Sequence, residues 1–215
     1  MLVHLDGDEP IDVSLEALER SRLAVGDALD PKTREGLLDA DADVRVREAA
    51  LNLLAHRART RQELRRRLRQ KGFLAPRVDR CLERLQEKGL LDDAAVAAAF
   101  VRDRLRHRPR GRTRLVSELR AKGVESEVAS EAIATVFGDE EVTDAELARE
   151  AAEAWLARQS GGVARALASE DTTAERDKAR RRLYGYLARR GFHGEALHGA
   201  LEHARGVSDA ETEPE

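Results

Sequence analysis

The sequence predicts an all-α protein of three tandem three-helix repeats that form an elongated array, preceded by a short N-terminal β-hairpin. A phrase that ends on glycine and an apolar residue recurs three times, as "LRRRLRQKGF" (64–73), "LVSELRAKGV" (115–124) and "LYGYLARRGF" (183–192). Apolar positions downstream of each glycine coincide as well, and a helical pattern precedes each phrase. Repeats of this kind bury their apolar faces by stacking on their neighbours, which favours extended rather than globular arrangements.

The composition suits packed helices in a cytoplasmic protein. The 215 residues are 41% hydrophobic, which is enough for packed cores, and 37% charged, which is typical of helices with solvated outer faces. No apolar run approaches the roughly 18 residues of a membrane span, and the start lacks the pattern of a signal peptide. The single cysteine, Cys81, cannot form an internal disulfide and falls among apolar positions, so we expect it in the core.

The first 43 residues form an acidic segment that differs from the repeats. Apolar residues alternate in "LVHLDGDEPIDV" around Asp6-Gly7, which favours a short hairpin. Two short helices are expected next, one after Ser14 and one after Asp30.

The three repeats are predicted at residues 44–91, 92–138 and 139–205. In each, a glycine is expected to end a helix in the left-handed conformation that glycine adopts without steric penalty. These glycines are Gly72, Gly123 and Gly191. The second spacing is longer than the first, and the extra residues predict an enlarged loop at 160–175. The acidic end, residues 206–215, is expected to be disordered.

Charge is strongly segregated along the chain. Residues 44–137 hold 23 Lys and Arg against 12 Asp and Glu, a net +11, whereas residues 1–43 carry −8 and residues 138–215 carry −6. A basic middle between acidic ends indicates an anionic partner held by the middle. The alternative is that arginine-rich helices are simply well solvated.

Cations on the repeated phrase and in "RLRHRPRGRTR" (104–114) are the candidate partner-binding residues. The second stretch is predicted to be a loop whose guanidinium groups suit carboxylates or phosphates. Cations opposite the leucine faces of the repeated helices join this set. Lys122 also has a structural alternative, because a cation before a glycine stop meets the negative end of the helix dipole. The predicted set is Arg66, Arg69, Arg108, Arg110, Arg112, Arg114, Arg120 and Lys122.

No pattern in the sequence indicates catalysis, a cofactor or a metal site. Metal sites need several tightly spaced ligands, and this chain has one cysteine and six scattered histidines. There is no glycine-rich phosphate cradle and no nucleophile elbow. Trp155 shares a helical face with Leu147 and Ala151, which predicts core packing. We therefore expect a protein that is not an enzyme.

The middle of the chain resembles a known family. "GLLDDAAVAAAFVRDRLRHRPRGRTRLVSELRAKGV" (89–124) is similar to the core of the RecX family of bacterial recombination regulators, in its Leu-Asp-Asp helix start, its arginine-rich stretch to a glycine and its Leu-x-x-Glu-Leu-x-x-Lys-Gly. "LNLLAHRARTRQELRRRLRQKGF" resembles the family's first repeat and "RLYGYLARRGF" its third. The resemblance covers residues 44 to 204. The chain departs from the family pattern in two places. Val96 stands where an aromatic residue is common, and the third unit has a long insertion and acidic surroundings.

The resemblance implies a modulator that lies in the groove of the RecA recombinase filament on DNA. Such a protein acts in homologous recombination, DNA repair and the SOS response, most often by inhibiting the ATPase, strand exchange and filament growth of RecA. The prediction is for a cytoplasmic monomer that binds RecA, with DNA inside the filament as a further contact, and that has no membrane partner. The alternative is a helix-turn-helix-like DNA-binding protein that acts through phosphate contacts.

Overall fold

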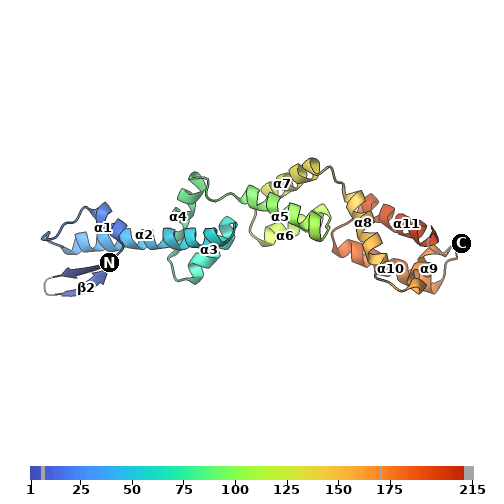
Figure 1. The fold of residues 1–215 in the computed structure, drawn as a ribbon, viewed down its shortest axis with the longest axis horizontal. Coiled ribbons are helices and arrows are strands. Elements are labelled where there is room, and N and C mark those ends of the chain that lie inside the picture. The colour runs from blue at the N-terminus through green and yellow to red at the C-terminus, as the bar shows by residue number, and fades with distance from the viewer. Residues whose placement is uncertain (6–7, 170, 211–215) are drawn as a thin grey trace. The chain divides into compact units, whose positions relative to one another are not determined.

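A computed structural model describes residues 1–5, 8–169 and 171–210, and the chain divides into two compact units, Met1–Asp92 and Asp93–Glu215 (Figure 1). The described residues form eleven helices and one two-stranded antiparallel sheet. The predicted all-α class with an N-terminal hairpin is confirmed. Among the described helices, none combines the length and the apolar character needed to cross a bilayer.

The hairpin and a short helix open the first unit. Strand β1 (Leu2–Leu5) pairs with β2 (Asp8–Asp12), with Val3 opposite Ile11. The Asp6-Gly7 turn lies outside the described residues. Helix α1 (Leu15–Ser21) follows, and the Ser14 side chain accepts a hydrogen bond from the backbone nitrogen of Ala17 at its start.

The second helix, which was expected to be short, has 26 residues: α2 (Pro31–His56). The expected boundary between the N-terminal segment and the first repeat, at residues 43 and 44, therefore lies inside this helix. Leu37 and Val44 pack in a core with the hairpin and α1, while Val46 and Ala50 pack in the core of the first repeat. The boundary was placed at a change in charge. Such a change does not end a helix, and no glycine or proline interrupts the chain after Gly36 until Gly72.

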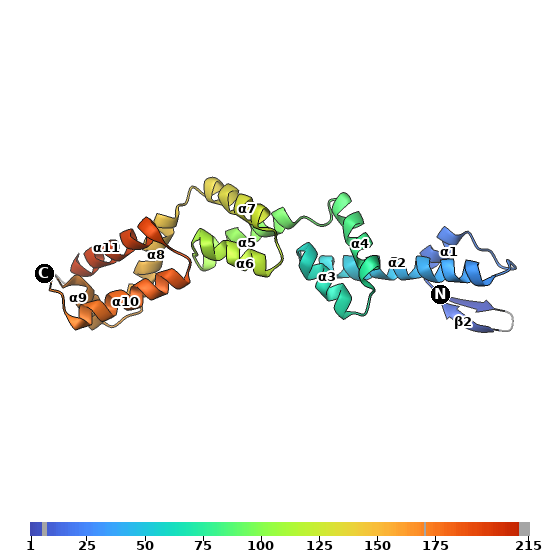
Figure 2. The same cartoon turned by 180° about the vertical axis from the view of Figure 1, so that it is seen from behind.

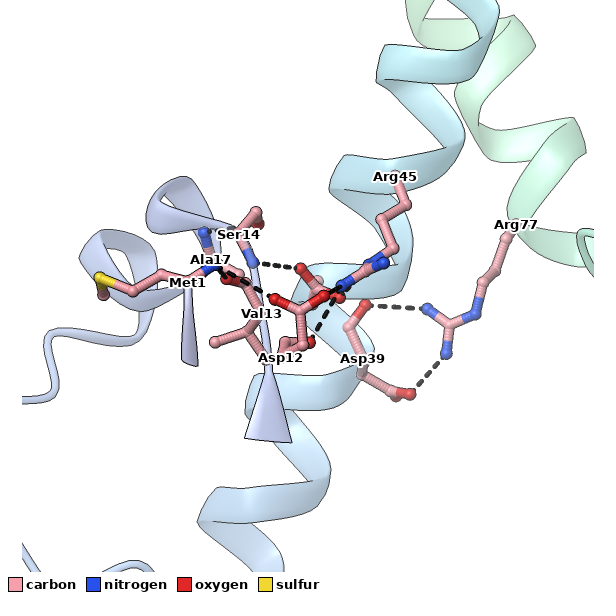
Figure 3. A network of polar contacts seen from close by, with 9 residues as sticks. Met1, Asp12, Val13, Ser14, Ala17, Asp39, Arg45 and Arg77 are labelled. Atoms are coloured by element: carbon pink, nitrogen blue, oxygen red, sulfur yellow. Dashed lines mark hydrogen bonds and ion pairs between the residues drawn. The ribbon is translucent and has the colours of Figure 1, made fainter. Parts of the chain in front are cut away.

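A polar network fixes the N-terminal segment to α2 (Figure 3). The Asp41 carboxylate is buried. It accepts a hydrogen bond from the backbone nitrogen of Ser14 at 2.6 Å and another from the Arg45 Nε at 2.5 Å. Arg45 also reaches the side chain of Asp12 at 3.2 Å. Burial alone would raise the pKa of Asp41, but these hydrogen bonds outweigh it and lower the pKa. The carboxylate therefore stays charged where it ties β2 and α1 to the long helix.

The first repeat combines the end of α2 with α3 (Arg61–Gln70) and α4 (Ala75–Glu87). Its core contains Leu64, Leu68 and, as predicted, Cys81, which is 8% exposed. Gly72 ends α3 with φ +92°, and the Phe73 nitrogen donates back to the Leu68 carbonyl at 3.3 Å. This is the expected glycine stop.

The second and third repeats share one continuous core. The helices are α5 (Asp93–His107), α6 (Arg112–Ala121), α7 (Ser126–Asp139), α8 (Asp144–Leu156), α9 (Gly161–Ala168), α10 (Ala174–Arg189) and α11 (Gly194–Ala210). Residues from both repeats, including Leu119, Ile133, Leu187 and Leu201, belong to a single buried cluster. Trp155 is 7% exposed within it, as predicted.

Two expectations for the third repeat are wrong. The segment 160–175 is not simply a loop, because it contains α9, whose Leu167 and Ala168 are buried and which contacts both α10 and α11 (Figure 2). The sequence signal is weak because two glycines open this helix. Residues 206–210 are not disordered either, since α11 continues to Ala210: extending a packed helix costs little once it is nucleated. Residues 211–215 lie outside the described residues.

Replacing Gly123 by Val is expected to lower the unfolding free energy of the second unit by about 1–3 kcal/mol. Gly123 has φ +83°, a conformation that a β-branched residue adopts only under strain, and the next residue, Val124, is buried and donates to the Leu119 carbonyl at 3.1 Å. Thermal unfolding checks this. Gly206→Val, where an added Cβ meets no atom within 4 Å and the glycine has no positive φ, serves as the control. Equal melting temperatures for the two variants would contradict the prediction.

Candidate protein-interaction surface

The arginine-rich stretch 104–114, which was predicted to be a loop, consists of the end of one helix, a four-residue connection and the start of the next helix. Helix α5 continues to His107 and α6 begins at Arg112, so only residues 108–111 connect them. Most of the arginines therefore lie on helices, because arginine is a good helix former and only the Pro109-Arg110-Gly111 break interrupts the pattern. Their directions are set by helix packing.

Three of these arginines converge on one carboxylate, that of Glu118 on α6. The Arg114 Nε lies 2.9 Å from Glu118 Oε1, the Arg110 Nη1 3.2 Å from the same oxygen, and the Arg104 Nε 3.2 Å from Oε2. The Glu118 side chain is only 18% exposed. Burial raises its pKa, but the hydrogen bonds from Arg114 and Arg104 and the charge of Arg110 outweigh burial and lower the pKa. The contacts give Arg110 and Arg114 a role inside the fold that needs no partner.

The connection itself is docked on the C-terminal end of α10. Gly111 donates its backbone N–H to the Arg190 carbonyl at 2.9 Å, and Arg190 Nη1 donates to the Pro109 carbonyl at 3.1 Å. A Cβ added to Gly111 would lie 2.4 Å from the carbonyl oxygen of Gly191, so only glycine permits this approach. The second repeat is thereby joined to the glycine stop of the third.

Three further predicted residues also contact their own chain. The Arg112 guanidinium lies 4.1 Å above the Phe137 ring, and the Lys122 ammonium lies 5.4 Å from the Phe100 ring. Arg69 donates to the Phe73 carbonyl at 2.6 Å, at the stop of its helix. These cations stabilise the fold where they lie.

The remaining predicted residues, Arg66, Arg108 and Arg120, are exposed and form no side-chain hydrogen bond or ion pair within the described part of the chain. Arg66 lies on α3 of the first unit, and the other two lie in the second unit. Arg120 borders a shallow hollow of about 690 Å³ on the outer face of α6, which is also lined by Thr113, Val116, Ser117 and Ala121. These three are the predicted cations whose side chains have no hydrogen-bond or ion-pair partner among the described residues.

The sequence interpretation missed a second group of cations, on α4 and at Lys88 directly after it. Arg77, Arg80, Arg84 and Lys88 recur every three or four residues and so form one stripe of the helix, and they line a cavity in the first unit. Their spacing is visible in the sequence, but their convergence with α1 and α2 is not. Over the described ranges there is no group of three or more His, Cys, Asp or Glu arranged to hold a metal ion.

Comparison with protein families identifies two matches in this chain. The model described as "RecX, first three-helix domain" matches residues 47–85, and that described as "RecX, second three-helix domain" matches residues 92–133. A protein named regulatory protein RecX from Mycobacterium sp. (strain JLS) is 39% identical over 166 residues, which cover 75% of this chain and 85% of that protein. The protein of the same name from Mycolicibacterium smegmatis is 39% identical, with 77% and 78% covered.

Two solved structures have a similar fold. A crystal structure of regulatory protein RecX aligns with a TM-score of 0.72 and 24% identity, covering 94% of this chain and 93% of that one. RecX from Lactobacillus salivarius aligns with a TM-score of 0.61 and 21% identity over 78% of this chain and 99% of that one.

Proposed function

The chain belongs to the RecX family of regulatory proteins, and we propose that it binds the filament of the RecA recombinase and inhibits its ATPase, strand exchange and growth. It acts by occupying a surface of the filament and has no chemistry of its own. The choice of RecA as partner depends on the resemblance to the RecX family. The observation that supports the contact surface is the division among the predicted cations: five have partners within their own unit, whereas Arg66, Arg108 and Arg120 are exposed without one among the described residues.

An exposed arginine without an internal partner favours an external carboxylate or phosphate. Its planar guanidinium offers paired donors, and it is always charged at physiological pH. Such residues steer association and fix its register more than they add affinity. In this proposal the three arginines contact acidic groups of the filament, and the hollow beside Arg120 receives part of a RecA protomer.

The DNA-dependent ATPase of the cognate RecA tests the proposal. Adding the protein to preformed filaments at constant salt is expected to lower the rate in a concentration-dependent way. An unchanged rate, with no binding of the protein to filaments in a sedimentation assay, would refute the proposal.

Reversing Arg66, Arg108 and Arg120 together to Glu is expected to raise the concentration for half-inhibition by at least about tenfold, because like charges facing each other at an interface cost several kcal/mol. The matched control reverses Arg149, Lys178 and Arg181, which are also exposed and unpaired among the described residues and change the net charge equally. Circular dichroism should show the same helical signal for both variants. Equal loss of inhibition in both would assign the effect to bulk charge.

The basic middle of the chain also favours the alternative, direct binding to DNA phosphates. In that case the protein binds DNA without RecA, and its affinity falls steeply as salt rises because counterions are released on binding. Binding to filaments that exceeds binding to the same DNA alone, at the same salt, separates the proposed function from this alternative.

A further inference from the structure

A basic cavity of about 300 Å³ lies inside the first unit, between α1, α2 and α4. Its walls carry six cationic side chains against two carboxylates, Glu16 and Asp43, and its apolar lining includes Cys81 and Leu85. The cations are Arg20, Arg47, Arg77, Arg80, Arg84 and Lys88.

Half of the cations are already held by carboxylates. Arg47 makes two hydrogen bonds to Glu16 across the α1–α2 contact. Arg77, whose side chain is 18% exposed, lies 2.9 Å from Asp43. It also contacts Asp39, and Figure 3 shows this second contact. Arg80 lies 3.3 Å from the same Asp43. These pairs position the walls and hold α1 and α4 against α2.

The other half form no ion pair in the described unit. The pKa of the Glu16 carboxyl is lowered first by its hydrogen bonds with Arg47 and further by the nearby charges of Arg20 and Lys88. Arg20 of α1, Arg84 of α4 and Lys88, which follows α4, are exposed and form no side-chain hydrogen bond or ion pair in the described residues. Six cations against two carboxylates leave a net positive charge around the partly enclosed cavity, which concentrates a positive potential there. An anion between these charges would offset their mutual repulsion.

The residues that line the cavity indicate which class of anion it can bind. Burial raises the pKa of the Cys81 thiol, so this part of the wall is neutral at pH 7. The described residues that line the cavity include no aromatic side chain, so no aromatic ring is available there to stack on a nucleobase. Guanidinium forks and an ammonium together suit the oxygens of phosphate groups, and several phosphates match several cations better than one carboxylate does.

We propose that this cavity binds a small polyphosphate, either free or as the phosphate chain of a nucleotide, through Arg20, Arg84 and Lys88. Arg47, Arg77 and Arg80 position the walls and add to the potential. The site goes beyond the proposed function, since it lies in the first unit, requires α1 of the N-terminal segment, and includes none of the cations proposed to contact the filament.

Calorimetric titration of the full chain with inorganic tripolyphosphate tests the site. One anion is expected to bind per chain, and Arg84→Glu is expected to lower the affinity at least about tenfold, as the loss of a charged hydrogen bond implies. Arg20→Gln should weaken binding as well, because α1 supplies that wall. The control is Arg34→Glu, an exposed and unpaired position on α2 in the same unit that does not line the cavity; its affinity should equal that of the wild type.

Cys81 provides a second measurement, because it is the one cysteine of the chain and lines the cavity. Its alkylation by iodoacetamide should slow when tripolyphosphate is added to the wild type and not when it is added to Arg84→Glu. ATP and CTP should bind with equal affinity, since the proposed contacts are to the phosphates and the described lining has no aromatic ring to select a base. The proposal is overturned by any of three outcomes. The wild type does not bind tripolyphosphate, Arg34→Glu loses as much affinity as Arg84→Glu, or the protein binds an oligonucleotide but not tripolyphosphate. None of these outcomes depends on RecA.

Discussion

Gly111→Ala is expected to lower the unfolding free energy of the second unit by about 3 kcal/mol, at the upper end of the cost of overpacking. The added Cβ would lie 2.4 Å from the oxygen and 2.7 Å from the carbonyl carbon of Gly191. Both are backbone atoms, so neither can rotate away as a side chain could. The hydrogen bond from Gly111 to the Arg190 carbonyl should break as the two segments separate. Gly111 itself has φ −68°, so the loss comes from the contact and not from backbone strain.

Urea unfolding followed by circular dichroism measures this loss. Gly199→Ala is the matched control: it lies within α11, and a Cβ there meets no atom within 4 Å. Since alanine is the better helix former, this control should be more stable than the wild type by up to about 1 kcal/mol. If both variants gain stability, the Gly111–Gly191 contact does not form in solution.

Glu118→Gln is expected to lower the unfolding free energy at pH 7 by about 2 kcal/mol. The change leaves Arg104, Arg110 and Arg114 without their shared carboxylate. Removing one partner of a fully buried ion pair costs about 3–5 kcal/mol, and the partial exposure of this cluster reduces that figure. Glu150→Gln, at an exposed position on α8 without an ion pair in the described residues, should change stability by less than about 0.5 kcal/mol.

The effect of Glu118 should also depend on pH. Because the pKa of Glu118 is lowered from 4.5, its contribution is complete above that value and is lost as pH falls through the lower pKa of the folded state. The unfolding free energies of the wild type and Glu118→Gln should therefore differ by a constant amount near neutral pH and converge in acid. A difference that grows on acidification would show that the carboxylate does not stabilise the folded state.

Glu118→Gln also bears on function, because it removes the carboxylate that pairs with Arg110 and Arg114. If Arg110 and Arg114 serve the fold, Glu118→Gln should change stability while conditions that keep the protein folded preserve inhibition of RecA. For the exposed Arg108, two residues from Arg110, we expect the opposite: its replacement should weaken inhibition of RecA and leave stability unchanged.

Features set by neighbouring residues could be predicted from the sequence. Gly72, Gly123 and Gly191 all have positive φ, because the steric preference that ends a helix at glycine is local. The buried positions of Leu64, Leu68, Leu115 and Leu119 follow from a spacing of four on one helix face. The family resemblance was read from the same repeated segments and was confirmed, because a family is recognised by local sequence patterns of this kind.

Features that join distant residues were decided only by the tertiary structure. Whether an arginine in 104–114 faces a partner or its own fold depends on the position of Glu118 and on the approach of Gly111 to Gly191, which are 80 residues apart. The basic cavity likewise needs α1 to dock on α2 beside α4. A sequence pattern records which side chains share a helix face, whereas packing between helices determines which charges are neutralised. The sequence therefore determined the repeats and the charge of this protein, and the packing determined which of those charges remain available.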